Sequence, residues 1–398
     1  MKELKSQRLH IGFFGKTNVG KSSIINCITG QSVSIVSDVA GTTTDIVEKS
    51  MELLPIGPVN FIDTAGTDDV SELAKQRIEK TLSTISRIDI GVIVCDYNGF
   101  NEYDKLLTEK FNELKIPFII IVNKTDISNI ERSKYNELKN YTQNIILTSV
   151  NTDENLVYKI KQNLINILPD DFVNPPKIAA DLIAPKSIAV LVIPIDKQAP
   201  KGRLILPQVQ VIRDLLDNNC KVIAVKESEL KDVLNELKNP PSLVITDSQA
   251  FKKVSEIVPK SIPLTSFSIL FARLKGDLEV FLKGAKNIDL LKDNDKILIL
   301  ESCTHHPIED DIGRVKIPTL LKKKTGKNLI IENYSGHDMP DISGYKLIIH
   351  CGACMTNRRE ILSRIIKANQ AGIPITNYGI AISYCLGICK RATEIFYK

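Results

Sequence analysis

The chain has 398 residues, of which 43% are hydrophobic, and a formal net charge of +5 from 52 basic and 47 acidic side chains. This composition excludes a disordered protein and allows two or three domains, each with its own core. The near balance of charge gives little support for nucleic-acid binding, and the longest basic run, Lys322 to Lys324, is typical of a solvated helix end. Residues 1–10 lack an apolar signal region, and no apolar run approaches the roughly 20 residues that span a bilayer. We therefore expect a cytoplasmic protein with reduced thiols and no membrane segment.

The first predicted elements form a phosphate-binding site. A short apolar strand, LHIGFFG, runs into GKTNVGKSS, where Gly15 and Gly20 let the backbone wrap phosphates with its N–H groups pointing inward. Lys21 is expected to reach the β and γ phosphates, and Ser22 to bind Mg²⁺. Ser23 adjoins them among the expected nucleotide contacts.

Later segments identify the nucleotide as GTP. DVAGTTTD follows the loop, then the strand NFIDTAG, and then the strand PFIIIVNKTD. Asp126 can accept hydrogen bonds from N1–H and the exocyclic amine of guanine, an edge that adenine does not present. Asp63 is placed to hold Mg²⁺ through water, and the amide of Gly66 to sense the γ-phosphate. Further base contacts are expected from Asn123, Lys124 and, as a weaker match after the strand NIILTSV, Thr148 and Ser149.

Residues 9–168 resemble a small GTPase domain of the Era/TrmE type, because GKTNVGKS and DVAGTTTD are similar to its P-loop and switch I. The resemblance implies that Thr43 completes the Mg²⁺ shell. Thr67 follows Gly66, so the glutamine that orients water in Ras has no counterpart. In relatives of this type a K⁺ ion, held partly by an asparagine at the position of Asn18, supplies charge stabilisation, which predicts slow, K⁺-stimulated hydrolysis. The alternative is that Asn18 only shapes the loop. The expected catalytic groups are Lys21, Asn18, Thr43 and Gly66.

The middle of the chain predicts a second α/β domain. Apolar residues at helical spacing in ENLVYKIKQNLINILP close a first domain at residue 169, and the proline-containing segment 170–186 predicts a stiff linker. Residues 187–262 then alternate strands with helices, which indicates a parallel sheet. The strands are expected at 188–195, 221–225 and 242–246, and the helices at 209–216 and 230–237. This domain shows no phosphate loop or carboxylate cluster, so an interaction role is expected.

A third domain is expected over residues 263–398. It begins with the helical stretch SFSILFARLKGDLEVFLKGA and continues with strands at 296–300, 328–332, 345–350 and 373–377 and helices at 358–368 and 380–396. Cys385 and Cys389 lie four apart on that last predicted helix and hence on one face, while Cys27, Cys95 and Cys220 are expected in cores. The predicted fold class is therefore α/β: a P-loop GTPase domain followed by two smaller α/β domains with mainly parallel sheets.

Thiols and imidazoles gather in LILESCTHHP and LIIHCGACMTN. Cys303 falls just past one predicted strand, Cys351 falls at the end of another, and Cys354 follows after a turn. If the two strands are neighbours, their carboxyl ends bring these thiols to one edge of the sheet. Ordinary buried cysteines would not explain the clustering, and a redox pair of Cys351 and Cys354 would not account for Cys303. A Cys₃His zinc site and a [4Fe–4S] cluster on three cysteines both fit the count.

The order of these features resembles the HydF family of [FeFe]-hydrogenase maturation GTPases. An Era/TrmE-type GTPase domain precedes Cys-x-His, 44 intervening residues and His-Cys-x-x-Cys. The resemblance implies a [4Fe–4S] cluster on Cys303, Cys351 and Cys354, with a labile fourth position for which His305 and His350 are candidate ligands. It also implies a homodimer formed by the middle domain, and a scaffold that receives a diiron subcluster built by radical-SAM maturases and delivers it to apo-[FeFe]-hydrogenase, without membrane or nucleic acid. The alternatives are a tRNA-modifying or ribosome-associated GTPase with a zinc site, and an iron–sulfur carrier without hydrogenase specificity.

Overall fold

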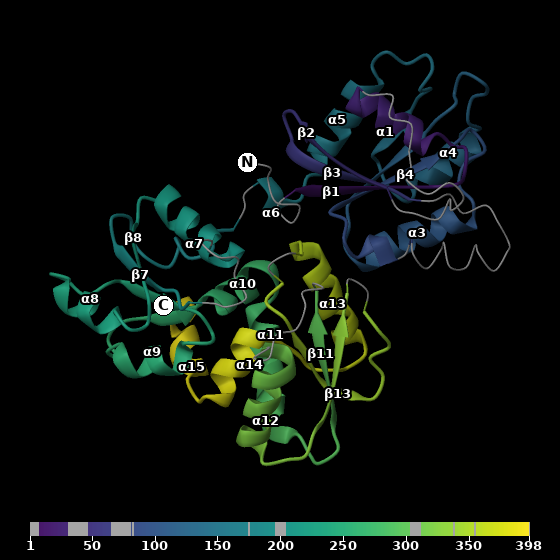
Figure 1. Cartoon of the computed structure of the whole chain (residues 1–398). Coiled ribbons are helices and arrows are strands. Elements are labelled where there is room, and N and C mark those ends of the chain that lie inside the picture. Colours follow the sequence, from purple (N-terminus) through teal and green to yellow (C-terminus); the bar gives the residue numbers. More distant parts are fainter. Residues whose placement is uncertain are drawn as a thin grey trace. The chain divides into compact units, whose positions relative to one another are not determined.

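The computed structural model describes residues 8–30, 47–64, 81, 83–173, 176–195, 204–302, 312–336, 339–353 and 356–397. The chain forms two compact units, Met1–Pro175 and Pro176–Lys398. Figure 1 shows the whole chain, with labels on many of its helices and strands.

The first unit is built on a six-stranded sheet with the order β2-β3-β1-β4-β5-β6, in which only the β2–β3 pairing is antiparallel. Its strands are β1 (Leu9–Phe14), β2 (Val47–Leu53), β3 (Gly57–Asp63), β4 (Ile90–Cys95), β5 (Phe118–Val122) and β6 (Ile145–Leu147). Its helices are α1 (Lys21–Thr29), α3 (Glu102–Glu113), α4 (Arg132–Lys139), α5 (Leu156–Asn166) and α6 (Asp170–Val173).

The central strands β1, β4 and β5 are buried along their whole length, as expected for parallel strands covered on both faces. Cys95 at the end of β4 is buried, which confirms the prediction for that residue. The prediction for Cys27 is wrong, because Cys27 is exposed. The buried stripe of α1 is formed by Lys21, Ile24, Ile25 and Ile28, so Cys27 falls on the opposite face of the helix.

The second unit contains two four-stranded sheets. The first has the order β10-β9-β7-β8 and is parallel throughout. It comprises β7 (Ile188–Val192), α7 (Leu206–Asp217), β8 (Lys221–Val225), α8 (Leu230–Glu236), β9 (Leu243–Thr246), α9 (Phe251–Ile257), β10 (Leu264–Ser266) and α10 (Phe267–Lys275).

Three features of this sheet differ from the sequence prediction. β7 ends at Val192 rather than at residue 195. The short strand β10 was not predicted, and it lies beyond residue 262, where the second domain was expected to end. Ala179 and Ala180, expected within the linker, are buried in the core under this sheet, and their N–H groups both donate to Asp214 of α7. Apolar residues of the predicted linker thus belong to the second unit.

The other sheet of this unit has the order β12-β11-β13-β14 and is also parallel. Its strands are β11 (Lys296–Glu301), β12 (Ile330–Ser335), β13 (Tyr345–His350) and β14 (Ile375–Asn377). The helices are α11 (Leu278–Lys286), α12 (Ile317–Thr325), α13 (Arg358–Gln370), α14 (Tyr378–Cys385) and α15 (Cys389–Thr393), with short helical turns at Asn287–Leu290, Ile312–Lys316 and Glu394–Tyr397. Figure 1 shows α11, α12 and α14 together on one side of β11 and β13.

The long helices predicted at both ends of the third domain are broken. The first is interrupted at Gly276 and Asp277, where the Asp277 side chain caps α11. The last one ends at Cys385 and resumes at Cys389, because Gly387 takes a left-handed conformation with φ 73° between them. The two thiols are therefore not four apart on one helix, and the prediction that they share a helix face is wrong. Both are half-buried, and burial raises the pKa of Cys385 to about 12.

Candidate functional site

The loop between β1 and α1 has the backbone of a phosphate-binding loop. Gly15 and Gly20 have φ angles of 134° and 100°, which side chains on Cβ disfavour. A Cβ on Gly15 would lie 2.1 Å from the carbonyl oxygen of Val94 on β4. Asn18 at the exposed tip of the loop has φ 62°, a conformation that asparagine tolerates better than most residues. Tight turns and a close approach to β4 thus explain the glycine spacing.

Lys21 is folded back over this loop. Its ammonium group donates hydrogen bonds to the carbonyls of Gly15 at 2.9 Å and Lys16 at 2.6 Å, and the residue is 7% exposed. The Lys21 ammonium group therefore lies at the loop whose backbone N–H groups are expected to bind the phosphates. Ser23, in the first turn of α1, is exposed.

The structure brings together Ser22, at the start of α1, and Asp63, at the end of β3. The Ser22 hydroxyl donates to Asp63 Oδ2 at 2.6 Å, and Oδ1 of the same carboxylate is buried with no hydrogen-bond partner in the described part of the chain. Burial raises the pKa of Asp63, while the Ser22 hydrogen bond and the charge of Lys21 oppose the rise. A hydroxyl beside a carboxylate with an unsatisfied oxygen suits a hard cation such as Mg²⁺.

Asn123 links the two loops on which a nucleotide would rest. Its amide nitrogen donates to the carbonyl of Val19 at 2.8 Å, and its side-chain oxygen accepts from the N–H of Val150 at 3.1 Å. The residue is 3% exposed. Asn123 therefore acts on the nucleotide site through the backbone of both loops.

The base-binding side lies at the carboxyl ends of β5 and β6. Asp126 is exposed, and Lys124 has the left-handed φ of 61° that turns the chain after β5. The buried Thr148 hydroxyl donates to Asp153, which also accepts from Lys159 at 2.8 Å. Ser149 is buried and its hydroxyl accepts from the N–H of Asn151. Thr43, Gly66 and Thr67 lie outside the described residues.

The carboxyl edge of the third sheet carries the described part of the thiol site. β11 and β13 are parallel neighbours, with Leu300 opposite His350. The backbone N–H of Ser302, just before Cys303, donates to Cys351 Sγ at 3.3 Å, and the N–H of Cys351 donates to the carbonyl of Leu300. The chain positions leading to Cys303 and Cys351 thus meet, as expected if the two strands are neighbours.

Three of the predicted ligands, Cys303, His305 and Cys354, lie outside the described residues. Within the described ranges, no three His, Cys, Asp or Glu side chains are gathered so as to hold a metal ion. Ala353, the last described residue before Cys354, has a left-handed φ of 53°.

A buried arginine that sequence reasoning missed joins the ends of three strands. Arg364 of α13 is 2% exposed and donates to the Ser302 hydroxyl at 2.8 Å, to the Gly336 carbonyl at 2.6 Å and to His350 Nε2 at 2.6 Å. Its guanidinium also pairs with buried Glu360 at 3.0 Å. The only sequence signal was an i, i+4 acid–base pair, which is usually a surface feature.

This network engages both ring nitrogens of His350. With its proton on Nδ1, the ring donates to the Cys351 carbonyl at 2.7 Å, while Nε2 accepts from Arg364. The residue is 1% exposed. Ligation of iron by His350 would require one of these contacts to break, so in this arrangement the ring orients the backbone at Cys351.

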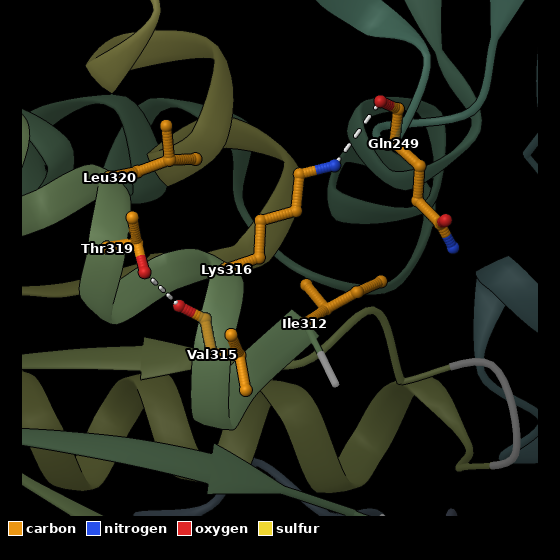
Figure 2. A pocket seen from close by; sticks show the side chains of 6 residues that line it. All are labelled: Gln249, Ile312, Val315, Lys316, Thr319 and Leu320. Carbon is orange, nitrogen blue, oxygen red and sulfur yellow. Dashed lines mark hydrogen bonds between the residues drawn. The ribbon is translucent and has the colours of Figure 1, made fainter. Parts of the chain in front are cut away.

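A separate hollow of about 430 Å³ lies in the second unit. Its lining residues are Gln249, Ile312, Val315, Lys316, Thr319 and Leu320. Figure 2 shows the ammonium of Lys316 reaching the carbonyl of Gln249, at 3.3 Å, with the Thr319 hydroxyl donating to Val315. Burial lowers the pKa of Lys316. Among the described residues that line this hollow there is no carboxylate and no thiol.

Three family models match successive parts of the chain. Residues 10–124 match the 50S ribosome-binding GTPase model, residues 178–276 the hydrogen maturase F dimerization domain, and residues 279–395 the hydrogen maturase F tetramerization domain. The chain belongs to the hydrogen maturase F family. The α/β fold, with a P-loop GTPase domain and further domains with mainly parallel sheets, is thereby confirmed. The names of the two C-terminal models suggest oligomerization for family members.

Curated relatives match the GTPase part. The tRNA modification GTPase MnmE of Mesoplasma florum is 38% identical over 157 residues, which are 38% of this chain and 33% of that protein. GTPase Der of Wolinella succinogenes is 35% identical over 127 residues, 31% of this chain and 27% of that protein. The chain thus spans about a third of the length of these relatives. Among solved structures, Aquifex aeolicus Era bound to GDP and AlF₄⁻ is 18% identical with a TM-score of 0.35, covering 55% of this chain and 93% of that one. In the part of the chain that is described, no helix is long and apolar enough to cross a membrane.

Proposed function

We propose that this chain is a GTP-hydrolysing scaffold that binds a [4Fe–4S] cluster and delivers the diiron subcluster precursor to apo-[FeFe]-hydrogenase. The observation that carries the proposal is the junction of β11 and β13, where the N–H before Cys303 donates to the sulfur of Cys351. Membership of the hydrogen maturase F family links this junction to hydrogenase maturation.

GTP hydrolysis is supported by the GTPase family match and by the loop geometry. The described residues proposed to contact GTP are Gly15, Asn18, Gly20, Lys21, Ser22, Ser23, Asp63, Asn123, Lys124, Asp126 and Ser149. Mg²⁺ would be held by Ser22 directly and by Asp63 through water, a role that suits the unsatisfied Oδ1. Thr43 would complete the Mg²⁺ shell and Gly66 would sense the γ-phosphate. These two complete the proposed catalytic set with Lys21 and Asn18.

K⁺ is proposed to stimulate the hydrolysis through Asn18. This asparagine is exposed on the phosphate loop in a left-handed conformation, so its side-chain oxygen is accessible to a cation near the phosphates. A monovalent cation there would offset negative charge that develops during phosphoryl transfer.

For the cluster, Cys303, Cys351 and Cys354 are the proposed ligands. The hydrogen bonds between Ser302 and Cys351 and between Cys351 and Leu300 hold the end of β11 beside the end of β13. No thiol other than that of Cys351 takes part in these two contacts. A cluster on three thiolates supplies an iron atom with an exchangeable fourth position. His305 is the stronger candidate of the two histidines for that position, since the ring of His350 is engaged by Arg364 and the Cys351 carbonyl.

The proposed partners are radical-SAM maturases, apo-hydrogenase and a second copy of this chain. The domain boundaries proposed from sequence are 1–169, 170–186, 187–262 and 263–398.

GTP would act as a switch, because ordering of the switch loops around the γ-phosphate can change a partner-binding surface without direct contact with the iron. Equal affinities for maturases and hydrogenase in the GTP-analogue and GDP states would contradict this role.

The main rival is a tRNA-modifying or ribosome-associated GTPase with a zinc site. The curated relatives match only the GTPase part, so they do not favour this rival for the rest of the chain. Anaerobic purification and reconstitution, with iron, sulfide and zinc analysis and EPR of the reduced protein, separate the two. Iron and sulfide that are lost in Cys303→Ala support the proposal. Zinc without sulfide, or full cluster occupancy in Cys303→Ala, contradicts it.

A further inference from the structure

The two sheets of the second unit have the same strand topology. In each sheet the first strand along the chain lies between the second and the third, and the fourth strand lies beside the third: β8-β7-β9-β10 and β12-β11-β13-β14. Open parallel sheets with this order bind ligands at the carboxyl ends of their first and third strands, where the direction of winding reverses. In the first of these two sheets, that place lies at the ends of β7 and β9.

The helices of this sheet show the same reversal. α7 packs through Val211 in the core on one face, whereas α8 and α9 pack through Leu230 and Phe251 in the core on the other face. The ends of the two strands are also joined, because the N–H of Asp247, just after β9, donates to the carbonyl of Val192 at 3.3 Å. The carboxyl end of β9 is therefore the position at which this topology favours a ligand.

The hollow of about 430 Å³ opens at that position (Figure 2). Gln249, three residues past the end of β9, lies on one side of it, and the helical turn Ile312–Lys316 with the start of α12 lies on the other. Apolar side chains of Ile312, Val315 and Leu320 line it, and Val315 is 45% exposed. An apolar lining with one charged group is the usual composition of a small-molecule site.

Both sides of the hollow are anchored in one buried core. Ile317 and Leu321 of α12 belong to the same core as Phe251 of α9. The loop after β9 is closed on itself, since the N–H of Gln249 donates to Asp247 Oδ1 at 3.1 Å. Packing of the two sides, rather than the course of a surface loop, therefore sets the width of the hollow.

Lys316 supplies the charged group. Within the described residues its ammonium makes one hydrogen bond, to the carbonyl of Gln249 at 3.3 Å, although an ammonium group can donate three. The side chain is half-buried, and burial lowers the pKa of Lys316 while the charge of Asp247 opposes the shift. The Thr319 hydroxyl does not compete for a ligand, because it donates to the carbonyl of Val315 at 2.7 Å. An anion beside Lys316 would replace the hydration that the ammonium has lost.

We propose that this hollow is a binding site for a small organic anion, a carboxylate with a short branched aliphatic chain. The carboxylate pairs with the ammonium of Lys316, and the aliphatic chain packs on Ile312, Val315 and Leu320. The site lies apart from the nucleotide loops and from the junction of β11 and β13, so it adds a ligand to those of the proposed function.

The test uses the full chain with ¹³C-labelled methyl groups of Ile, Leu and Val, titrated with isovalerate and followed by NMR. The methyl signals of Ile312, Val315 and Leu320 are expected to shift and saturate with a Kd on the order of 1 mM, as suits a ligand of this size. Isovaleramide has the same shape without the charge and should bind ~10-fold more weakly. Acetate has the charge without the chain and should also bind ~10-fold more weakly.

A pair of variants assigns the charge preference to one residue. In Lys316→Met, isovalerate and isovaleramide should bind equally, because the partner of the carboxylate is gone. Lys322→Met, on the exposed face of α12, should keep the ~10-fold preference of the parent for isovalerate. The methyl spectra of both variants without ligand show whether the fold is retained.

Several results would overturn the site. Shifts that do not saturate in the parent, or equal binding of isovalerate and isovaleramide by the parent, would do so without any variant. A charge preference that persists in Lys316→Met would assign the anion to another group. Neither GTP nor iron enters these titrations, so their outcome is independent of the proposed function.

Discussion

The side-chain amide of Asn123 donates to the backbone carbonyl of Val19 at 2.8 Å across 104 positions of sequence. With the bond from the N–H of Val150, it fastens the phosphate loop to the base-binding loop. A Cβ on Gly20 would lie 2.3 Å from the same amide nitrogen, so the glycine at that position also serves this contact. The nucleotide site is thus organised by a residue whose side chain is directed at protein backbone.

Asn123→Ala is expected to weaken binding of GDP by ~10-fold or more, because two buried hydrogen bonds are lost at about 1 kcal/mol each. Titration with a fluorescent GDP analogue measures the change. Asn129→Ala, at an exposed position after β5, is the matched control and should bind as the parent does. An Asn123→Ala protein with parental affinity would show that the two loops hold each other without this link.

Asp63→Asn is expected to stabilise the nucleotide-free protein at neutral pH while it abolishes Mg²⁺-dependent GTP binding. Burial raises the pKa of Asp63, so its charged form is disfavoured in the folded state. Below the pKa that Asp63 has in the unfolded chain, the protonated carboxyl group therefore favours folding. This contribution to the free energy of unfolding is lost as the pH rises through the higher pKa of the folded state. Denaturant unfolding of both proteins at several pH values should show a difference that grows with pH and disappears in acid. A difference independent of pH would contradict the assignment.

Asn18→Ala is expected to remove the difference between KCl and NaCl in the rate of GTP hydrolysis. The parent should hydrolyse GTP faster in KCl than in NaCl, since the proposed site near Asn18 is expected to bind K⁺ and not Na⁺. Phosphate release is measured in both salts at equal ionic strength. Rates for Asn18→Ala that are equal to those of the parent in KCl would contradict a cation role for Asn18.

Arg364→Met is expected to destabilise the second unit by about 3–5 kcal/mol, because it removes one partner of a buried ion pair and three further hydrogen bonds. Arg213→Met is the control: Arg213 pairs with Asp217 on the exposed face of α7, where solvent screens the pair, so its loss should change the stability far less. Unfolding in urea is monitored by hydrogen exchange of amides in β11, β12 and β13. This measures the stability of the second unit separately from that of the GTPase domain. Equal costs for the two variants would show that the Arg364 network is not needed to hold the strand ends.

The nucleotide site could be predicted because its residues are local in sequence. Gly15 to Gly20 form one loop that runs directly into α1 with Lys21 and Ser22, Asp63 ends the strand β3, and Asn123 directly follows the unbroken apolar run of β5. Two apolar strands that end just before cysteines could also be predicted, whereas their pairing as neighbours was only a condition of the hypothesis and is shown by the structure. The sequence did not predict the antiparallel strand β2, most of whose residues are exposed or half-buried.

Other features depend on contacts that a single sequence does not reveal. In the sequence, Arg364 and Lys275 look like ordinary helix-surface cations. Only tertiary packing buries Arg364 against strand ends and Lys275 against the carbonyls of Ala353 and Thr356. The three residues of β10 are too few to show a period. The break at Gly387 was missed because apolar residues continue on both sides of it, so Cys385 and Cys389 were assigned to one helix.

Because α10 contributes to two cores, the second unit has no clean point at which to be divided for expression. A fragment that starts at residue 263 would take β10 from its sheet and expose Leu270 and Phe271 to water. A fragment that ends at residue 276 would keep those contacts but leave Ile269 and Ala272 uncovered, and it would separate Lys275 from the carbonyl of Ala353 that it contacts. Either truncation would present an apolar helix face of the kind that drives aggregation. Isolated pieces of this half of the chain are therefore poor substitutes for the whole unit in biochemical work.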